Sequence, residues 1–466
     1  MSETETAPET EAAAGETHRD ERLSHEFVES VVALLEEDHV DGVRALIDTL
    51  HPADIADLFE LVPSDIRRPL AAAIAEKLDG DVLAEMNDWV RDEVIEALEP
   101  HQVAELATEL DTDDAVAIIE DLDADDQREV LRALAPDDRA AIEEALSYPE
   151  ESAGRLMQRD LIAVPEHWTV GQVIDYVRAN PELTTDFWEI FVVDPSHHPV
   201  GTMKLSWVLR TPREIAVADV MMREQTLIPV EMDQEEVALR FQKYALISAA
   251  VVDHSGRLAG MITVDDVVHI IQEEASEDIL RMSGAGEGDI NEPLPSTIRT
   301  RMWWLFINLG TAVLASAVVA AFQGTISRLV TLAVLMPIVA GMGGNAATQT
   351  MAVTVRALAT NQLTSSNTVR MIMRELWIAL ANGFGFGILM GIVCQLIYHD
   401  QALSLVLFAA MLINSINAGL SGVLIPLLLV KCRVDPAVTS TVFVTTMTDV
   451  MGFFSFLGLA TLFGLS

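Results

Sequence analysis

The stretch Thr445-Thr446-Met447-Thr448-Asp449-Val450-Met451-Gly452 lies inside an apolar run, 437–465, that is long enough to cross a lipid bilayer as an α-helix. Asp449 stands near the middle of this run. An ionised carboxylate at that depth costs several kcal/mol, so it normally faces a polar cavity, pairs with a cation or is protonated. The sequence therefore predicts a functional Asp449. The alternative is a protonated side chain that only holds neighbouring helices together.

The hydropathy of the chain changes at residue 299. From there the sequence predicts a transmembrane domain, 299–466, with five spanning helices, over 302–322, 329–358, 376–397, 403–430 and 437–465. Lys and Arg residues gather before the first span, between the second and third, and between the fourth and fifth. By the positive-inside rule the N-terminus is cytoplasmic and the C-terminus external. The start of the chain lacks the basic and apolar regions of a signal peptide, which agrees with this orientation.

Charge is distributed unevenly along the chain. Only 4 of the 72 acidic residues but 8 of the 29 basic residues lie from Arg299 onward, so the first 298 residues carry a net charge of −47 and the remainder +4, which together give −43. An acidic surface of this kind repels nucleic acid and attracts cations, although a merely solvated surface would give the same count. We therefore expect no nucleic-acid partner and predict divalent cations and membrane lipid as partners.

The polar residues of the second predicted span cluster in a glycine-rich segment, 341–349, which contains Gly344, Asn345 and Thr348. A glycine-rich break in a spanning helix exposes backbone carbonyl groups, which is tolerated where the backbone lines a cavity. We therefore predict that this segment interrupts its helix and contributes oxygen ligands to an ion path.

Further oxygen ligands lie in and before the fifth span. Thr445 precedes Asp449 by about one turn, and Asp435 stands before the span, either as an N-cap or as part of an acidic ring at the pore mouth. Carboxylate, amide and hydroxyl oxygens are hard ligands that suit Mg²⁺ or Ca²⁺ and not zinc or copper. One buried carboxylate per chain is few for a divalent ion, whereas a symmetric dimer would bring two Asp449 side chains together.

The acidic half divides into three parts before the membrane domain. Residues 1–22 are rich in Glu, Thr and Ala and predict a disordered acidic tail. Residues 23–150 predict a helical superhelix of short helices, because acidic helix starts recur every 12 residues at Asp111, Asp123 and 135–138. We interpret these carboxylates as helix caps first and as weak cation contacts second.

Residues 151–271 contain an internal duplication, with copies at 151–213 and 214–271. Phe191-Val192-Val193-Asp194 parallels Ala250-Val251-Val252-Asp253, and each copy predicts helix, strand, helix, strand, a Gly-containing turn, strand and helix. This pattern resembles a tandem pair of cystathionine-β-synthase (CBS) domains. The resemblance implies ATP binding at the second copy, through Thr263 and Asp266. The alternative is that Asp265 only caps the next helix.

The segment 272–298 predicts an acidic connecting helix that leads into the membrane domain. Glu274, Glu277 and Asp278 occupy positions i, i+3 and i+4 and share one face, where they repel one another unless a cation or a partner lies between them. Both a cation-sensing face and an ordinary solvated face fit this pattern.

The order of these parts is similar to that of the MgtE family of magnesium channels and transporters. The resemblance rests on the acidic helical N-domain, the CBS pair, the connecting helix, and the motifs around Gly344, Asp435 and Asp449. It implies a multidomain α and α+β fold, a homodimer with a pore between two five-helix sets, and a connecting helix that plugs the pore.

The same resemblance implies a regulatory Mg²⁺ site at Asp266, Glu274, Glu277 and Asp278. His269 replaces a carboxylate expected there, and Thr441 replaces an amide that is common in the pore.

The predicted function is regulated uptake of Mg²⁺ as both substrate and regulator. A transporter of Co²⁺ or Mn²⁺ and a membrane-anchored CBS nucleotide sensor are the alternatives. No nucleophile, general base and orienting group occur together, so an enzyme is not predicted.

Overall fold

The computed structural model describes residues 23–465, apart from 76, 97, 121, 181–182, 184–186, 284–289 and 365, and gives only the backbone of 278, 283 and 438–440. The acidic tail predicted at 1–22 lies outside the described residues. The chain forms two compact units, Met1–Val268 and His269–Ser466, which are described separately.

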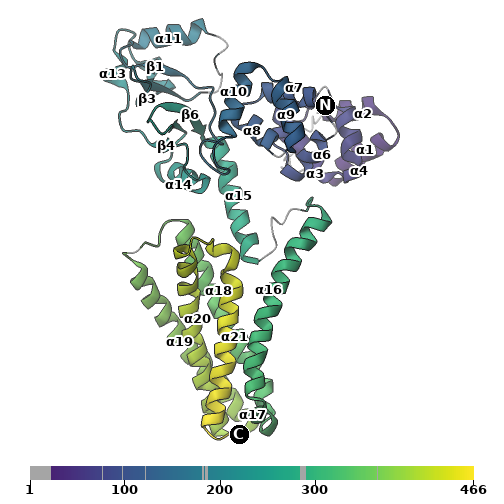
Figure 1. Cartoon of the computed structure of the whole chain (residues 1–466), viewed down its shortest axis with the longest axis vertical. Helices are drawn as coiled ribbons and strands as arrows, with labels where there is room; N and C mark the ends of the chain where they lie inside the picture. The colour runs from purple at the N-terminus through teal and green to yellow at the C-terminus, as the bar shows by residue number, and fades with distance from the viewer. Residues whose placement is uncertain are drawn as a thin grey trace, which may run out of the picture. The chain divides into compact units, whose positions relative to one another are not determined.

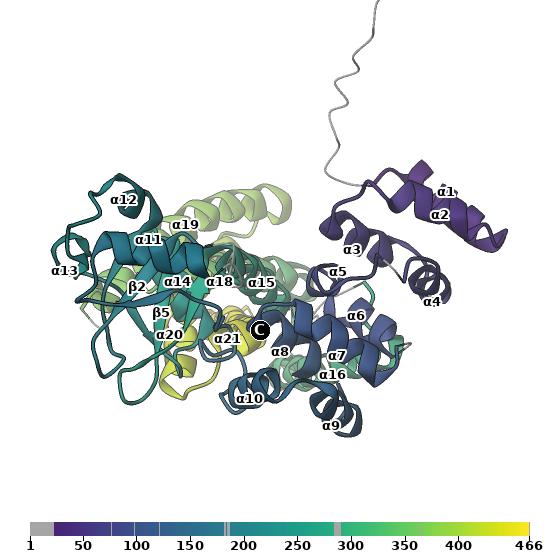
Figure 2. The same ribbon diagram turned by 90° about the horizontal axis from the view of Figure 1, so that it is seen from above.

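The first unit begins with ten short helices, which follow one another as the sequence predicts (Figure 2). They are α1 (His25–Glu36), α2 (Val40–Ile47), α3 (Pro52–Leu61), α4 (Ser64–Ala73), α5 (Gly80–Ala84), α6 (Asp88–Ile95), α7 (Pro100–Glu109), α8 (Thr112–Glu120), α9 (Ala124–Ala133) and α10 (Pro136–Ala145). Capping explains the repeated starts: the Asp123 carboxylate accepts hydrogen bonds from the amides of Asp125 and Asp126. Their apolar faces share one continuous core.

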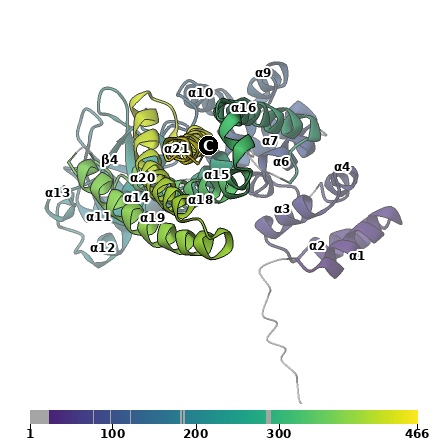
Figure 3. The ribbon, with the colours of Figure 1, turned by 90° about the horizontal axis from the view of Figure 1, so that it is seen from below.

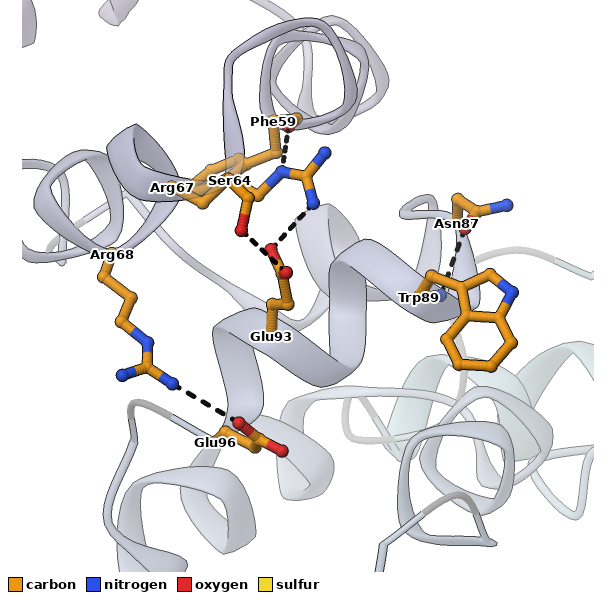
Figure 4. A network of polar contacts seen from close by, with 8 residues as sticks. All are labelled: Phe59, Ser64, Arg67, Arg68, Asn87, Trp89, Glu93 and Glu96. Atoms are coloured by element: carbon orange, nitrogen blue, oxygen red, sulfur yellow. Dashed lines mark hydrogen bonds and ion pairs between the residues drawn. The ribbon is translucent and has the colours of Figure 1, made fainter. Parts of the chain in front are cut away.

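A buried ion pair ties two of these helices together (Figure 4). The guanidinium of Arg67 on α4 is almost fully buried and donates to the Glu93 carboxylate of α6 at 2.7 Å, and the Ser64 hydroxyl donates to the other Glu93 oxygen at 2.8 Å. Arg68 and Glu96 form a second, exposed pair on the same two helices. Of the two arginines only Arg67 loses its hydration on folding, and Glu93 compensates for that loss. The first ion pair therefore matters more for the stability of the fold than the second.

Two three-stranded sheets of identical topology confirm the duplication (Figure 1). The first copy contains β1 (Ala163–Pro165), α11 (Val170–Ala179), β2 (Glu189–Val193), β3 (Pro199–Lys204) and α12 (Leu205–Arg210); the second contains α13 (Val217–Val220), β4 (Leu227–Pro229), α14 (Gln234–Tyr244), β5 (Ser248–Val252) and β6 (Leu258–Thr263). In each copy the first two strands are parallel and the last two antiparallel.

The two copies exchange their leading segments. Gln158, before the first sheet, pairs with Met261 on β6 of the second copy, and Met222 pairs with Thr202 on β3 of the first. Gly260 permits the close approach, since a Cβ there would lie 2.7 Å from the Gln158 carbonyl oxygen. One detail of the predicted pattern is wrong: the first copy begins with turns and bridges instead of a helix. The predicted glycine-containing turn is present between β5 and β6 of the second copy, at Gly256, whereas the turn between β2 and β3 of the first copy has no glycine.

Helix α15 (Val264–Ser283) continues directly from β6. It covers residues predicted both for the second CBS copy and for the connecting helix, so no loop separates the two. The described chain resumes at residue 290, and α16 begins at Leu294. This start lies within the segment 272–298, which was predicted as the connecting helix.

The second unit contains five helices that are long and apolar enough to cross a membrane among the residues described, as predicted. They are α16 (Leu294–Ala321), α18 (Thr331–Ala359), α19 (Thr368–Tyr398), α20 (Gln401–Lys431) and α21 (Pro436–Leu462), with the short α17 (Gln323–Arg328) after the first. Helices α18, α20 and α21 pack against one another, whereas α19 packs chiefly on α20 and α16 on α21 (Figure 3).

Helix α18 runs without interruption through Pro337 and the glycine-rich segment. The predicted break at 341–349 is therefore wrong. Apart from the Ala333 carbonyl group, to which Pro337 has no N–H to donate, a continuous helix can bond the backbone groups within the apolar layer, which outweighs the low helix propensity of glycine there.

Candidate functional site

Asp449 lies about halfway along α21 and is half-exposed on the surface of the single chain. No hydrogen bond or ion pair joins its carboxylate to another side chain in the described part of the protein. The neighbouring Thr448 is fully buried, and its hydroxyl lies 4.0 Å from the position that a Cβ on Gly344 would occupy. The crossing of α18 and α21 thus holds Asp449 beside the glycine-rich segment, with its acceptor oxygens free for a ligand.

The other predicted pore residues divide between this crossing and the exposed face of α18. Gly344 is at the crossing, while Asn345 and Thr348 are exposed one turn apart. The Thr348 hydroxyl donates to the Gly344 carbonyl oxygen at 3.0 Å, and the Thr445 hydroxyl donates to the Thr441 carbonyl oxygen at 2.8 Å. These hydroxyls therefore already satisfy the helix backbone, and their lone pairs remain available to water or a hydrated ion.

Asn414 on α20 was not predicted as a site residue, although it is a deeply buried polar group that packs against Gly452, one turn from Asp449. It is 1% exposed, its amide nitrogen donates to the Val339 carbonyl oxygen at 2.9 Å, and Oδ1 has no hydrogen-bond partner among the described residues. Glycines on both sides make room for it: a Cβ on Gly343 would lie 2.0 Å from the amide nitrogen, and one on Gly452 2.8 Å. Asn414 therefore sets how closely α18 and α21 approach.

Asp435 caps α21, because its carboxylate accepts a hydrogen bond from the Ala437 amide at 2.7 Å. The same carboxylate accepts a second bond from the guanidinium of Arg281, near the end of α15, at 3.2 Å. Arg281 also forms an ion pair with Glu277, one turn earlier on α15. An arginine thus lies between two carboxylates that were predicted as metal ligands, and the sequence analysis did not single it out.

The end of α15 also packs against the spanning helices. The Thr441 hydroxyl donates to the Met282 carbonyl oxygen at 2.7 Å, and Met282 packs against a cluster formed by residues of α18, α20 and α21. Thr441, where an amide is common in the resembled family, therefore binds the connecting helix. Glu274 is half-buried and has other contacts, and the Asp278 side chain lies outside the described residues.

A separate acidic cluster forms in the first unit, where α8 of the helical domain meets the start of α15. Burial raises the pKa of Asp114 to about 7, with a further rise from the charges of Asp266 and Asp111. Burial likewise raises the pKa of Asp266 to about 6, and it raises that of Asp113 well above its usual range, with Asp266 adding to the shift. Oδ1 of Asp113 is buried without a partner in the described chain. These carboxyls are therefore costly to ionise together.

Thr263 and Asp266 are bonded to each other. Asp266 Oδ2 accepts a hydrogen bond from the Thr263 hydroxyl at 2.6 Å and one from the Thr263 backbone N–H at 3.3 Å. The side-chain amide of Gln158 donates to the same oxygen at 3.4 Å. Asp266, and not the Asp265 of the capping alternative, therefore accepts the hydrogen bonds at the start of α15. Asp266 also belongs to the acidic cluster, a role that only the family resemblance implied.

The predicted ligands do not form a ready-made metal centre. In the described residues, no three His, Cys, Asp or Glu side chains are arranged to hold a metal ion together. Asp266 meets the helical domain, whereas Glu277 belongs to the arginine-bridged contact at Asp435. The four predicted regulatory residues therefore divide between at least two places.

Three family models match the chain. One described as divalent cation transporter matches residues 336–459, one described as MgtE intracellular N domain matches 50–151, and one described as CBS domain matches 217–273. The first covers α18 to α21, including Asp435 and Asp449.

Curated relatives extend this likeness over most of the chain. A protein of Bacillus subtilis (strain 168) named magnesium transporter MgtE is 28% identical over 94% of this chain and 97% of its own length. Its counterpart in Thermus thermophilus is 32% identical over 68% of this chain and 70% of its own.

Among solved structures, the cytosolic domain of the Mg²⁺ channel MgtE in complex with ATP is 27% identical, with a TM-score of 0.48, and covers 52% of this chain and 99% of that one. The structure of the soluble part of a magnesium transporter is 23% identical, with a TM-score of 0.47, and covers 54% of this chain and 98% of that one. On the evidence of the family models and of the relatives, this membrane-integral chain belongs to the MgtE family of divalent cation transporters.

Proposed function

We propose that the protein is a homodimeric channel for passive, regulated uptake of Mg²⁺ across the cytoplasmic membrane. The observation that carries this proposal is the half-exposed, unpartnered carboxylate of Asp449 midway along a spanning helix. A group of that kind is stable at membrane depth only beside water or a cation. Relatives of similar length are named magnesium transporters, which favours Mg²⁺ over the other hard cations that oxygen ligands accept.

The membrane potential supplies the driving force. A divalent ion entering a cell at about −100 mV gains about 4.6 kcal/mol, so no coupled ATP hydrolysis is needed. This requires the orientation predicted from the positive residues, with the soluble unit in the cytoplasm and the C-terminus outside.

A dimer explains how so few ligands suffice. Asn345 and Thr348 are exposed on α18, and Asp449 is half-exposed on α21 beside it. Two such surfaces facing each other across a symmetry axis would enclose two carboxylates and several neutral oxygens. Mg²⁺ loses its waters reluctantly and is usually held through one or two carboxylates, so this set suits a mostly hydrated ion.

Regulation would act through two contacts. In the acidic cluster, whose described carboxylates are not arranged as a metal centre, hydrated Mg²⁺ would take the place of protons as the counter-charge of Asp113, Asp114 and Asp266 and stabilise the packing of α8 on the second CBS copy. In the membrane unit, the Arg281 bridge and the Met282 contact hold the end of α15 against α21. We propose that this is the closed state, which low cytoplasmic Mg²⁺ releases.

ATP binding at the second CBS copy is part of the proposal. Thr263 and Asp266 would contact the ribose, and the same Asp266 serves the acidic cluster, so ATP and Mg²⁺ would influence each other's binding. Titration of the full chain with ATP, at low and at high Mg²⁺, tests this; equal ATP affinity at both concentrations contradicts the coupling.

Flux measurements test the transport function. The full chain is reconstituted in liposomes, and uptake of Mg²⁺ and of Ca²⁺ is compared for wild type, Asp449→Asn and Asp400→Asn. Asp400 is the matched control, because it caps α20 through the amides of Ala402 and Leu403, and Asn caps equally well. We expect Asp449→Asn to lose most Mg²⁺ uptake and the control to keep it. Unchanged uptake by Asp449→Asn would leave the nucleotide-sensor function as the better explanation.

The Arg281 bridge gives a test of gating. The side chains of Arg281 and Asp435 are about one-third exposed, so the ion pair between them stabilises the closed state by about 0.5–1 kcal/mol. For Arg281→Gln we therefore expect the Mg²⁺ concentration that halves the flux to rise by about two- to fivefold. Arg240→Gln removes an equivalent i,i+4 pair with Glu236 on α14 and should leave that concentration unchanged. The same shift in both variants, or in neither, would contradict the role of Arg281.

A further inference from the structure

A cavity lined by three arginines lies where α18 ends and α19 begins. Its volume is about 430 Å³, which is within the usual range for small-ligand sites. The lining residues are Val353, Arg356, Ala357, Gln362, Leu363, Asn367, Arg370, Met371 and Arg374. None of the lining residues lies on α21, the helix of Asp449, and the proposed transport mechanism does not use the cavity.

The positive charge in this cavity is uncompensated. The three arginines are exposed, and none of their guanidinium groups forms an ion pair or a side-chain hydrogen bond in the part of the chain that the structure describes. The nearest carboxylate in sequence, Glu375, is turned away: it is 5% exposed and accepts a hydrogen bond from the Thr350 hydroxyl in the helix interior. Three like charges around one cavity favour an anionic occupant.

The turn beside the cavity is held in one conformation. Asn361 has φ +50°, and the amides of Asn361 and Gln362 donate to the carbonyl oxygens of Leu358 and Ala357, which ends α18 in a Schellman motif. The Asn367 side chain then donates to the Gln362 carbonyl oxygen at 2.8 Å and accepts from the Thr364 amide at 2.9 Å. Little ordering is therefore needed when a ligand binds.

The position of the cavity selects the source of the anion. It lies at the ends of two helices that are long and apolar enough to span a membrane, where the headgroups of a bilayer would lie. The negative end of α18 and the positive end of α19 both adjoin it, so the arginines supply the attraction for an anion. Val353, Leu363 and Met371 give it an apolar wall. A phosphate with an attached apolar chain satisfies both the arginines and this wall.

We propose that this cavity binds the phosphate of an anionic phospholipid, with the guanidinium groups of Arg356, Arg370 and Arg374 as its donors. Guanidinium groups match phosphate oxygens through paired N–H donors. Because the site joins α18 to α19, the lipid tethers α19, which otherwise packs chiefly on α20.

The test measures how much lipid the full chain retains. Native mass spectrometry in neutral detergent detects the bound lipid after phosphatidylglycerol or phosphatidylcholine has been added. The variant Arg356→Gln/Arg370→Gln/Arg374→Gln removes the site. The control Arg299→Gln/Arg301→Gln/Lys431→Gln removes the same charge from the same end of the spanning helices, outside the cavity. At about fivefold for each lost charge-assisted hydrogen-bond donor to the phosphate, we expect the site variant to lose phosphatidylglycerol affinity by roughly 100-fold. The control makes no such contact and should lose much less.

A third arm distinguishes the sources of phosphate. Inorganic phosphate should fail to displace the lipid at millimolar concentration, and phosphatidylcholine should bind weakly. Equal losses in the site and control variants would show general surface attraction and overturn the proposal, as would a wild-type protein that retains no phosphatidylglycerol. Saturable binding of inorganic phosphate that excludes the lipid would assign the cavity to a soluble anion instead. Circular dichroism of each variant confirms that it is folded.

Discussion

Replacing Asp114 by Asn removes one charge from the acidic cluster while keeping the side-chain size. Burial and the neighbouring charges of Asp266 and Asp111 raise the Asp114 pKa from 3.8 to about 7, which corresponds to about 4 kcal/mol at 1.4 kcal/mol per unit. Because the carboxyls titrate together and Asp114 is partly exposed, we expect about half of this, about 2 kcal/mol, from one substitution. At about pH 8 without Mg²⁺, Asp114→Asn should therefore stabilise the closed packing of α8 by about 2 kcal/mol.

The pH dependence has a definite sign. Because the pKa of Asp114 is higher in the folded protein than in the unfolded chain, the folded protein binds more protons, and stability falls as pH rises from about 4 to about 7. Below that window the carboxyl is protonated in both states, and above it no further loss occurs. Millimolar Mg²⁺ should flatten this dependence in wild type, and Asp114→Asn should weaken both the pH effect and the Mg²⁺ effect.

Hydrogen exchange of the full chain measures these changes. Protection of the α8 amides, corrected for intrinsic exchange rates, is compared at about pH 6 and about pH 8, with and without Mg²⁺. Asp138→Asn is the matched control, because Asp138 holds the same third position in α10 that Asp114 holds in α8. Equal protection of wild type and Asp114→Asn at the higher pH would refute the reasoning, and so would equal stabilisation by the control.

Two further substitutions test packing. Gly343→Ala would place a Cβ 2.0 Å from the Asn414 amide and should destabilise the membrane unit by about 1–3 kcal/mol, whereas Gly341→Ala, which has nothing within 4 Å, should not; thermal unfolding in detergent measures both. Glu93→Ala removes the carboxylate from a buried guanidinium that keeps its bond to the Phe59 carbonyl oxygen, and should cost about 1–3 kcal/mol, against at most about 1 kcal/mol for the exposed Glu96→Ala; equal losses of the two in denaturant unfolding would contradict the difference in burial.

Local pattern was sufficient for much of the architecture. The apolar runs predicted all five spanning helices, because the bilayer requires about 20 apolar residues in sequence. The 12-residue recurrence of acidic helix starts predicted α8, α9 and α10, since capping is a contact between near neighbours. The duplication predicted two sheets of the same topology for the same reason.

Long-range contacts decided the rest. Asp113 and Asp114 follow the helix start predicted at Asp111, but only folding brings α8 beside Asp266 and raises their pKa values. Arg281 and Asp435 are 154 residues apart, so nothing in either local sequence indicates that they meet. These effects depend on burial and on charges from distant segments, which no local pattern encodes.

The glycine-rich segment of α18 shows the same division between sequence and tertiary structure. Its composition predicted a break in the helix, because glycine favours turns and exposes backbone. In the folded protein the missing Cβ at Gly343 instead makes room for Asn414, and the helix continues. The sequence by itself determined which segments cross the membrane and that Asp449 lies within one of them. Which side chains meet it was decided by tertiary packing, because close approach depends on the shapes of helices that are distant in sequence.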